Sequence, residues 1–391
     1  MRTVAVILGT RPEAIKFAPV IRQLQQDRRF RPVVISTGQH RQMLDETLRT
    51  FGLTADIDLG IMTPKQTLTQ VTHRSLEGLE SHLGALKPEA VLVHGDTATT
   101  LAGALAGFHL RIPVVHVEAG LRSGHLRSPF PEEGNRRLVA QISQLHLAPT
   151  PGNRANLLRE GIDPKSVVVT GNTVIDALHW AVGQAQDYDE PALRDIGLDH
   201  RRIILASAHR REAWPHLPRI AEAFRTIADE PDVRIVIPLH RNPAVRDAML
   251  PHISDHPNIT VVDPLPYLPF CKLMSRADLI LSDSSGSQEE GPALGKPTLV
   301  IGNVTERGEA VAGGSAKLVG TGTDGIVEST VELLRDPDAY ARMATAANPY
   351  GDGRATGRTI GALAHFFGMG PAVTPFDPAR PDQRHLATTG V

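Results

Sequence analysis

The chain has 391 residues, of which 41% are hydrophobic and 21% charged, and its net charge is −2. This length predicts two or three domains with cores of their own, and the near-zero charge gives no reason to expect nucleic acid or an anionic membrane as a partner. The single cysteine, Cys271, excludes an internal disulfide framework and a thiolate-rich metal site.

The chain begins almost at once with a predicted strand, so we expect no signal peptide. No apolar run approaches the ~18 residues that would span a bilayer. We therefore expect a soluble, cytoplasmic protein.

Short apolar runs recur along the chain, each followed by a longer stretch with helix-like spacing. In the first half they are residues 4–8, 32–35, 90–93, 113–117, 145–148 and 167–169. In the second half they are residues 203–206, 233–237, 259–262, 279–281, 297–301 and 316–319. Alternation of this kind is typical of parallel sheets covered by helices on both sides. The sequence therefore predicts an α/β fold of two doubly wound, Rossmann-like domains that face a central cleft.

The expected boundary between the domains lies near residue 171, in the segment TGNTV, where an asparagine or threonine can cap the next helix. We expect an N-terminal domain at 1–170 and a second domain at 171–355. A helix at 356–367 could return to the first domain. Residues 368–391 are rich in Pro, Asp, Arg and Thr without periodicity, so we expect a disordered tail.

Cations follow the first predicted strand, in the segment 9–16, GTRPEAIK. Pro12 suits a first helical position. Arg11 and Lys16 could then hold a phosphate or the charge that develops on a leaving group. The competing interpretation is a pair of ordinary surface cations.

Acidic residues follow the strands at 90–93 and 113–117. The segments HGDT and HVEAGLRS place Asp96 and Glu118 at the ends of these strands, and Glu132 and Glu133 follow at the start of a predicted helix. Carboxylates at a helix start also serve as caps. Because ligands bind beyond the carboxyl ends of parallel strands, however, these acidic positions should converge on one cleft. Acidic groups packed together have separated pKa values, as acid/base chemistry requires.

Two histidines follow strands of the second half, in the segments AHRREA and PLHRNP. A histidine flanked by arginines at a strand end can shuttle protons near neutral pH. Position, rather than residue type, therefore singles out His209 and His240 among the 17 histidines.

The strand at 279–281 runs into the segment SDSSGSQEEGPALGKPTLVI. We expect the Ser/Gly loop at 284–286 to open a helix whose unpaired N–H groups bind phosphate. Glu289 and Glu290 should lie in its first turn and accept hydrogen bonds from sugar hydroxyls. Phosphate donors beside hydroxyl acceptors indicate a nucleotide-sugar site. The alternative is a plain connection between a buried strand and a capped helix.

Several well-known motifs do not occur. No G-x-G-x-x-G fingerprint follows a strand, and there is no P-loop, which disfavours dinucleotide and P-loop binding. The sequence has no H-E-x-x-H segment or Cys/His array for a metal and no G-x-S-x-G elbow of a serine hydrolase.

Seven motifs in order carry a resemblance to a known family. They are GTRPEAIK, HGDT, HVEAGLR, PEE, GNTVID, HRRE and the combination of Ser284, QEE and TER, and they span roughly residues 1–367. Together they resemble the non-hydrolysing UDP-N-acetylglucosamine 2-epimerases. The hydrolysing relatives have a different pattern after the first strand.

The resemblance implies a GT-B fold, usually a homodimer, that interconverts UDP-GlcNAc and UDP-ManNAc without nicotinamide or metal. The family's proposed route is anti elimination of UDP to a 2-acetamidoglucal and re-addition of the enzyme-held UDP. By resemblance the acid/base residues are Asp96, Glu118, Glu132 and His209. By resemblance the substrate-binding residues are Arg11, Lys16, Phe270, Ser284, Ser285, Gly286, Glu290 and Arg307, with Glu290 on the ribose and Phe270 near the uracil.

Many bacterial members of the family are also activated by UDP-GlcNAc at a second, adjacent site. Positions that resemble this allosteric site are Gln39, Gln42, Arg74, Glu133, Arg211 and His240. The competing interpretation is polar lining of the same cleft. Ser285 stands where the family usually has glycine, and Gly308 where it has proline. These departures affect sugar specificity and allow a paralogue for a specialised metabolite rather than for amino sugar supply to the cell envelope.

Two other functions fit part of the pattern. A GT-B glycosyltransferase would share the phosphate loop and Glu290, but it needs an acceptor site and at most one catalytic base. A nucleotide-sugar sensor would keep binding and lose turnover. The four acid/base positions exceed what either function requires.

Overall fold

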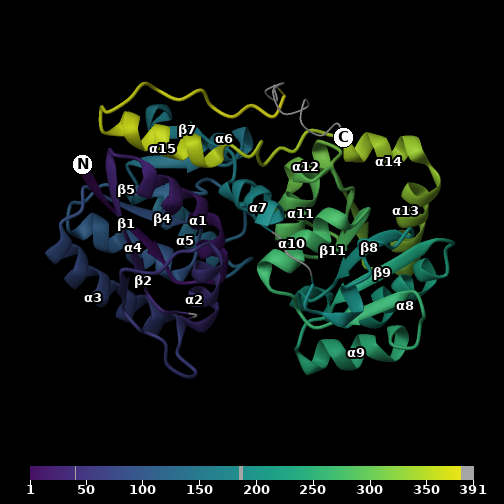
Figure 1. Ribbon diagram of the computed structural model, residues 1–391. Coiled ribbons are helices and arrows are strands. Elements are labelled where there is room, and N and C mark those ends of the chain that lie inside the picture. Colours follow the sequence, from purple (N-terminus) through teal and green to yellow (C-terminus); the bar gives the residue numbers. More distant parts are fainter. Residues whose placement is uncertain (40, 185–187, 380–391) are drawn as a thin grey trace. The chain divides into compact units, whose positions relative to one another are not determined.

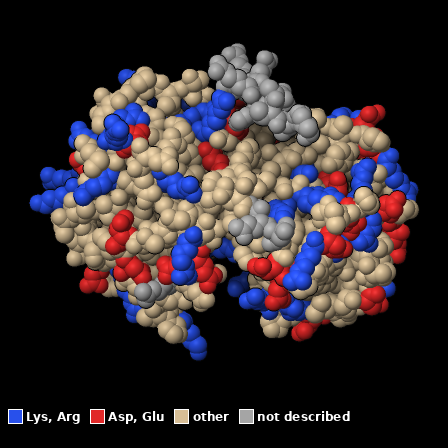
Figure 2. Space-filling view, in the orientation of Figure 1, with Lys and Arg blue, Asp and Glu red and all other residues tan. Residues whose placement is uncertain are grey.

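The computed structural model describes residues 1–39, 41–184 and 188–379 (Figure 1). The chain forms two compact units. Unit 1 combines Met1–Ala177 with the chain from Tyr350 onward, and unit 2 is Leu178–Pro349. None of the described helices is long and apolar enough to cross a membrane. On the face shown in Figure 2, acidic and basic side chains are interspersed over both units.

Unit 1 is built on a parallel sheet with the strand order β3-β2-β1-β4-β5-β6-β7. Its strands are β1 (Arg2–Leu8), β2 (Phe30–Ser36), β3 (Ile57–Asp58), β4 (Ala90–His94), β5 (Val114–Val117), β6 (Leu145–Ala148) and β7 (Val167–Val169). Its helices are α1 (Arg11–Gln26), α2 (Arg41–Thr50), α3 (Leu68–Leu86), α4 (Ala98–His109), α5 (Glu132–Ile142), α6 (Pro151–Arg159) and α15 (Ala355–Phe366). Helix α7 (Thr173–Gln184) begins in this unit and continues into unit 2.

Unit 2 contains a second parallel sheet with the order β10-β9-β8-β11-β12-β13. Its strands are β8 (Arg202–Ser207), β9 (Val233–Pro238), β10 (Ile259–Val262), β11 (Leu279–Ser282), β12 (Thr298–Ile301) and β13 (Ala316–Gly320). Its helices are α8 (Leu217–Ala228), α9 (Pro243–Ile253), α10 (Tyr267–Arg276), α11 (Ser285–Ala293), α12 (Gly308–Ala312), α13 (Thr323–Arg335) and α14 (Pro337–Ala344). Short 3₁₀ turns occur at Pro164–Ser166, Pro191–Leu193 and Arg211–His216.

The central strands are buried on both faces because helices cover each sheet from both sides. Every residue of β4, β5 and β11 is buried. In unit 1 the core joins these strands to the apolar faces of α3 and α4, and in unit 2 to α8 and α9. All twelve strands expected from the sequence are present, and the two-sheet α/β architecture is confirmed.

The division between the units differs by several residues from the expected one at 170/171. Asn172 donates its backbone N–H to the carbonyl oxygen of Tyr350 at 2.6 Å. The carboxylate of Asp176 accepts the N–H groups of Ala355 and Thr356 at 3.1 and 2.8 Å. These bonds hold the segment 171–177 in unit 1, together with α15, which packs against α1.

The C-terminal segment also differs from expectation where the structure describes it. We expected residues 368–391 to be disordered, but Phe376 is 4% exposed and donates its N–H to the carbonyl of Val169 at 2.8 Å. The Arg358 guanidinium lies 5.4 Å from the centre of the Phe376 ring. One buried aromatic side chain therefore fixes a segment that has no periodicity. Residues 380–391 lie outside the described part of the chain.

Candidate active site

The sheet of unit 1 brings two of the expected acidic residues to one edge. Strands β4 and β5 are neighbours, with His94 paired to Val117, so Asp96 and Glu118 follow adjacent strand ends. Glu118 has a φ of 62°, in the left-handed region that a non-glycine residue rarely adopts. Such a conformation costs ~1–3 kcal/mol and persists only where the surroundings fix it, often at functional sites.

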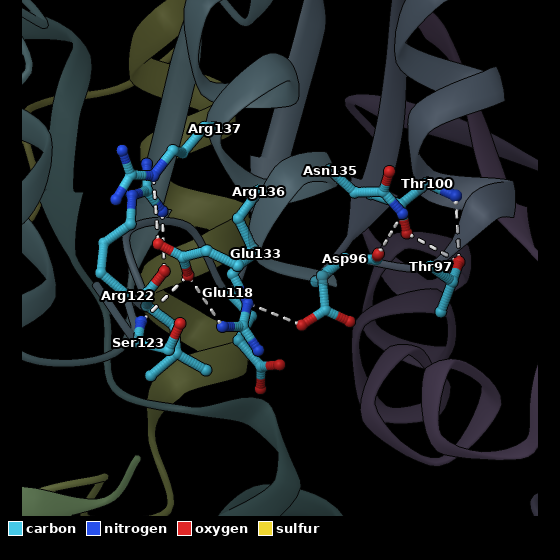
Figure 3. Close-up of polar contacts among 12 residues, drawn as sticks. Asp96, Thr97, Thr100, Glu118, Arg122, Ser123, Glu133, Asn135, Arg136 and Arg137 are labelled. Atoms are coloured by element: carbon cyan, nitrogen blue, oxygen red, sulfur yellow. Dashed lines mark hydrogen bonds and ion pairs between the residues drawn. The ribbon is translucent and has the colours of Figure 1, made fainter. Parts of the chain in front are cut away.

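Asp96 is held from helix α5 (Figure 3). The Arg136 side chain donates through Nε to Asp96 Oδ2 at 2.8 Å, and the Asn135 amide donates to the Asp96 carbonyl at 2.8 Å. Arg136 is 4% exposed and also contacts Glu133, at 3.2 Å. A buried cation therefore orients the Asp96 carboxylate and compensates its charge.

Glu133, an expected regulatory residue, is fully buried and engaged within unit 1. Its carboxylate accepts the backbone N–H of Ser123 at 2.9 Å and contacts Arg136 and Arg137 at 3.2 and 3.1 Å. Burial pushes the pKa of Glu133 upward, but these hydrogen bonds and positive charges outweigh it and lower the pKa. These contacts are to Ser123 and two arginine side chains rather than to the first N–H groups of α5, where no side-chain cap is present among the described residues. Glu132, the expected catalytic neighbour, is the first residue of α5 and half-buried.

Glu118 is held by two donors on one oxygen. The Lys16 ammonium pairs with Glu118 Oε2, and the Asn172 amide donates to the same atom at 2.7 Å. Lys16 was expected to bind substrate, so its position beside a catalytic candidate is a finding of the structure. A cation paired with a carboxylate favours the charged form of that carboxylate.

The turn at Gly9 and Thr10, which precedes Arg11 at the start of α1, is joined to the loop that carries Asp96 by a buried carboxylate, Glu13. It accepts the N–H of Gly9 and of Thr10 at 2.9 and 2.7 Å, and the hydroxyl of Thr97 at 2.6 Å. Burial raises the pKa of Glu13, and the hydrogen bonds offset this only in part. The carboxylate thus fixes the spacing of both loops.

The other expected regulatory residues of unit 1 make local contacts. Gln39 accepts the Thr99 hydroxyl at 3.0 Å, and Gln42 donates to Glu46 at 3.0 Å on an exposed helix face. Arg74 donates to the Thr63 hydroxyl at 2.5 Å. The remaining two positions of this set, Arg211 and His240, belong to unit 2.

In unit 2, His209 follows β8 and is oriented by Asp283. The Asp283 carboxylate accepts the N–H groups of His209 and Arg210, both at 2.7 Å, and its second oxygen lies 3.4 Å from His209 Nδ1. Burial lowers the pKa of His209; the charge of Asp283 opposes this shift, while His240 and Arg210 add to it. The His240 ring stacks on His209 with centroids 5.8 Å apart. With Nδ1 facing a carboxylate, Nε2 is the nitrogen that can accept a proton.

The expected phosphate loop is shorter than predicted because α11 begins at Ser285, directly after Ser284. Ser285 and Gly286 therefore form the first turn, and their N–H groups have no partner within the helix by geometry. Glu289 and Glu290 lie in the second turn rather than in the first. The Glu290 carboxylate nevertheless reaches back over that turn, since an added Cβ at Gly286 would lie 3.2 Å from its Oε2.

Arg307 is buried beside α11 and pairs with Glu289, which compensates part of its charge. The Thr305 hydroxyl donates to Gln288, and the backbone N–H of Arg307 donates to the Thr305 hydroxyl at 3.0 Å. These contacts tie the loop at 305–307 to the helix. Phe270 is half-buried in α10 of the same unit.

The sequence did not predict that Glu13, Arg136, Asn172 and Asp283 orient this set. Asn172 was noticed only as a possible helix cap, and the available signal for the others was their position in or next to segments noticed for other residues. Among the described residues, no group of three or more His, Cys, Asp and Glu side chains is placed to hold a metal ion.

Comparison with known proteins identifies the family. A family model described as UDP-N-acetylglucosamine 2-epimerase matches residues 22–364. The UDP-N-acetylglucosamine 2-epimerase of Escherichia coli K12 is 48% identical over 367 residues, covering 92% of this chain and 98% of the relative. The enzyme of the same name from Yersinia pestis is 49% identical, with the same coverage.

Solved structures agree. The UDP-GlcNAc 2-epimerase of Neisseria meningitidis bound to UDP-GlcNAc superimposes with a TM-score of 0.86 at 45% identity, covering 93% of this chain and 100% of that one. The Methanocaldococcus jannaschii enzyme in complex with UDP-GlcNAc and UDP gives 0.78 at 32% identity, covering 93% and 99%. Acinetobacter baumannii MurG shares the fold alone, with a TM-score of 0.59 at 15% identity. The chain therefore belongs to the UDP-N-acetylglucosamine 2-epimerase family.

Proposed function

We propose that this enzyme interconverts UDP-GlcNAc and UDP-ManNAc by inverting the configuration at C2 of the sugar. The observation that carries the proposal is the pair Asp96 and Glu118 at the ends of adjacent strands, each oriented by a buried cation or amide. The UDP-GlcNAc and UDP bound in structures of relatives support the choice of substrate.

The reaction begins with removal of the C2 proton by a carboxylate or by His209. As the C2–H electrons form the C1=C2 bond, the bond from C1 to the phosphate oxygen breaks and UDP departs, leaving 2-acetamidoglucal. A proton is then returned to the opposite face of C2, and the UDP oxygen attacks C1. Because C2–H is weakly acidic, a positioned base must act together with leaving-group departure, and such general catalysis contributes about 10²–10⁴-fold.

Each group has a part in this route. Asp96, Glu118, Glu132 and His209 supply acid/base groups, and two faces of C2 require more than one of them. The first-turn N–H groups of α11, with Arg11 and Arg307, stabilise the charge of the departing UDP. Glu290 accepts hydrogen bonds from ribose hydroxyls, and Phe270 packs near the uracil.

The test is proton NMR of UDP-GlcNAc incubated with the purified enzyme in D₂O without added cofactor. The expected result is UDP-ManNAc, with deuterium at C2 of both sugars. UDP with free ManNAc would indicate hydrolysis. Unchanged, undeuterated UDP-GlcNAc would contradict the proposal and favour a glycosyltransferase or a sensor. Asp96→Asn and His209→Asn variants should keep UDP binding by calorimetry and lose turnover.

Assembly and regulation are part of the proposal. We expect a homodimer, which light scattering after size-exclusion chromatography measures directly. We also expect activation by UDP-GlcNAc through Gln39, Gln42, Arg74, Glu133, Arg211 and His240. A linear, lag-free progress curve from UDP-ManNAc freed of UDP-GlcNAc would contradict this activation.

A further inference from the structure

Asn172 contacts a catalytic candidate from the segment where the chain approaches the end of unit 1. Its Nδ2 donates to Glu118 Oε2 at 2.7 Å, on the oxygen that also receives Lys16. Asn172 is 3% exposed. A hydrogen bond from a buried donor to a charged acceptor is stronger than one between neutral groups in water.

The orientation of this amide is fixed by its other contacts. Asn172 Oδ1 accepts the backbone N–H of Val174 at 3.1 Å, at the start of α7, which leaves Nδ2 to face Glu118. The backbone N–H of Asn172 donates to the carbonyl of Tyr350 at 2.6 Å. The chain leaves unit 1 after Ala177 and re-enters it at Tyr350. This hydrogen bond therefore connects the segment before the exit to the residue at which the chain re-enters.

We infer that Asn172 is a positioning residue that fixes the direction of the Glu118 carboxylate. The inference rests on the proposed function, in which Glu118 is an acid/base group. With Oε2 held by Asn172, Glu118 Oε1 lies against Gly95, 3.4 Å from where a Cβ at that position would be. Gly95 precedes Asp96 in the chain, so holding one oxygen directs the other toward the loop of the second catalytic carboxylate.

A purely structural role for Asn172 makes a different prediction. As the cap of α7 it needs only a side-chain acceptor for the Val174 N–H, and aspartate or serine caps a helix as well as or nearly as well as asparagine. A cap role therefore predicts that both replacements are harmless. A positioning role predicts that both reduce turnover, because an aspartate carboxylate has no N–H to donate to Glu118 and a serine hydroxyl, on a side chain one atom shorter, does not reach it.

The experiment compares N172D, N172S and a matched control, N258D, with the wild type. Asn258 lies in unit 2, donates through Nδ2 to the Ala228 carbonyl at 3.0 Å and accepts Arg201 at 3.1 Å, so its change to Asp removes the same kind of donor. Epimerisation is followed by NMR as kcat and KM over a range of pH, and folding by the thermal midpoint.

For N172D and N172S we expect kcat to fall about 10- to 100-fold, with KM changed less than about threefold. The acidic limb of the kcat profile should move to higher pH, because the charged form of Glu118 loses a donor. Lys16 of α1 and His94 of β4 also act on Glu118 electrostatically, and both stay unchanged in these variants.

The possible outcomes distinguish failure of the role of Asn172 from failure of the proposed function. Wild-type kcat and an unshifted pH profile in either folded variant would overturn the role of Asn172, as would an equal loss in N258D. A loss of kcat that came with a lower thermal midpoint and no pH shift would also overturn it, because the loss would then reflect impaired folding. An inactive wild type would instead refute the proposed function, and the inference with it, before any variant is compared.

Discussion

Buried histidines should make the stability of unit 1 depend on pH between about 7.5 and 5, and His94 and His116 are the two with the largest lowering of the pKa. His94 is 3% exposed and His116 is not exposed at all. Burial lowers the pKa of His94 from 6.5 to about 4; the charge of Glu118 opposes the shift, while that of Lys16 adds to it. Burial lowers the pKa of His116 to about 3, against the effect of its hydrogen bond to the Gly95 carbonyl.

The sign follows from the lowered pKa values. In the unfolded chain both rings take up a proton below their ordinary pKa of 6.5, whereas in the folded chain they stay neutral to about 4 and about 3. Folding stability is therefore complete above the ordinary value and falls as the pH decreases toward the folded values. At about pH 5 each ring costs about 2 kcal/mol relative to about pH 7.5, or about 4 kcal/mol together.

The perturbation that tests this number is His94→Phe. The replacement keeps an aromatic ring beside Phe17, whose centroid lies 5.2 Å from the His94 ring, and removes the titrating nitrogen. The free energy of unfolding is measured by urea titration with circular dichroism. Between about pH 7.5 and about pH 5 it should fall by about 2 kcal/mol less in the variant than in the wild type. Hydrogen exchange of peptides from β4 and β5 would localise the effect.

The control is His73→Phe, since His73 is 72% exposed beside Glu77. Its pH dependence should match that of the wild type within about 0.5 kcal/mol. Carboxylates with lowered pKa values, such as Asp27 and Asp352, lose their contribution only below the window used. Glu13 acts in the opposite sense because its pKa is raised, but it is common to all three proteins. An equal loss in the wild type and His94→Phe would refute the reasoning.

Three further predictions follow from the packing. Glu13→Gln should lower stability by about 3 kcal/mol and reduce kcat, because a buried amide cannot accept the hydrogen bonds of both loops; urea titration and NMR turnover measure the two effects. Gly120→Ala should lower stability by at least about 2 kcal/mol in the same titration, since Gly120 has a φ of 93° and an added Cβ would lie 2.3 Å from the carbonyl oxygen of Asn153. Cys271 is fully buried and should react with a thiol reagent only after denaturation, so rapid labelling of the native enzyme would contradict its position.

The fold could be predicted because strands buried on both faces leave a strong signal. Each of the twelve expected strands is an apolar run between polar segments. The strand that was missed, Ile57–Asp58, has two residues at the sheet edge and no run to detect. The first stretch of unit 1 ends at Ala177 rather than at the expected residue 170. The sequence does not reveal this, because Asp176 bonds to the N–H groups of Ala355 and Thr356, some 180 positions away.

The candidate site could be predicted only in part. Residues directly after strands, such as Asp96 and Glu118, are found because parallel topology sends strand ends to one edge. Their partners are not found in this way, since Arg136 in α5 and Asn172 before α7 lie 40 and 54 positions away in the sequence. The position of a residue after a strand predicts that it lies at the site. Its hydrogen-bond partners depend on tertiary packing, which the sequence pattern does not reveal.

That difference bears on how the acid/base groups work. Asp96 is held through Oδ2 by Arg136, Glu118 through Oε2 by Lys16 and Asn172, and His209 through its backbone N–H by Asp283, whose second oxygen faces Nδ1. If these groups act as proposed, each contact fixes the direction of an acid/base group within its own unit, which lowers the entropic cost of the step that the group catalyses. The proposed inversion at C2 depends on such directions more than on unusual residue types. Substitution of the residues that hold the acid/base groups should therefore reduce turnover even though these residues are not themselves acid/base groups.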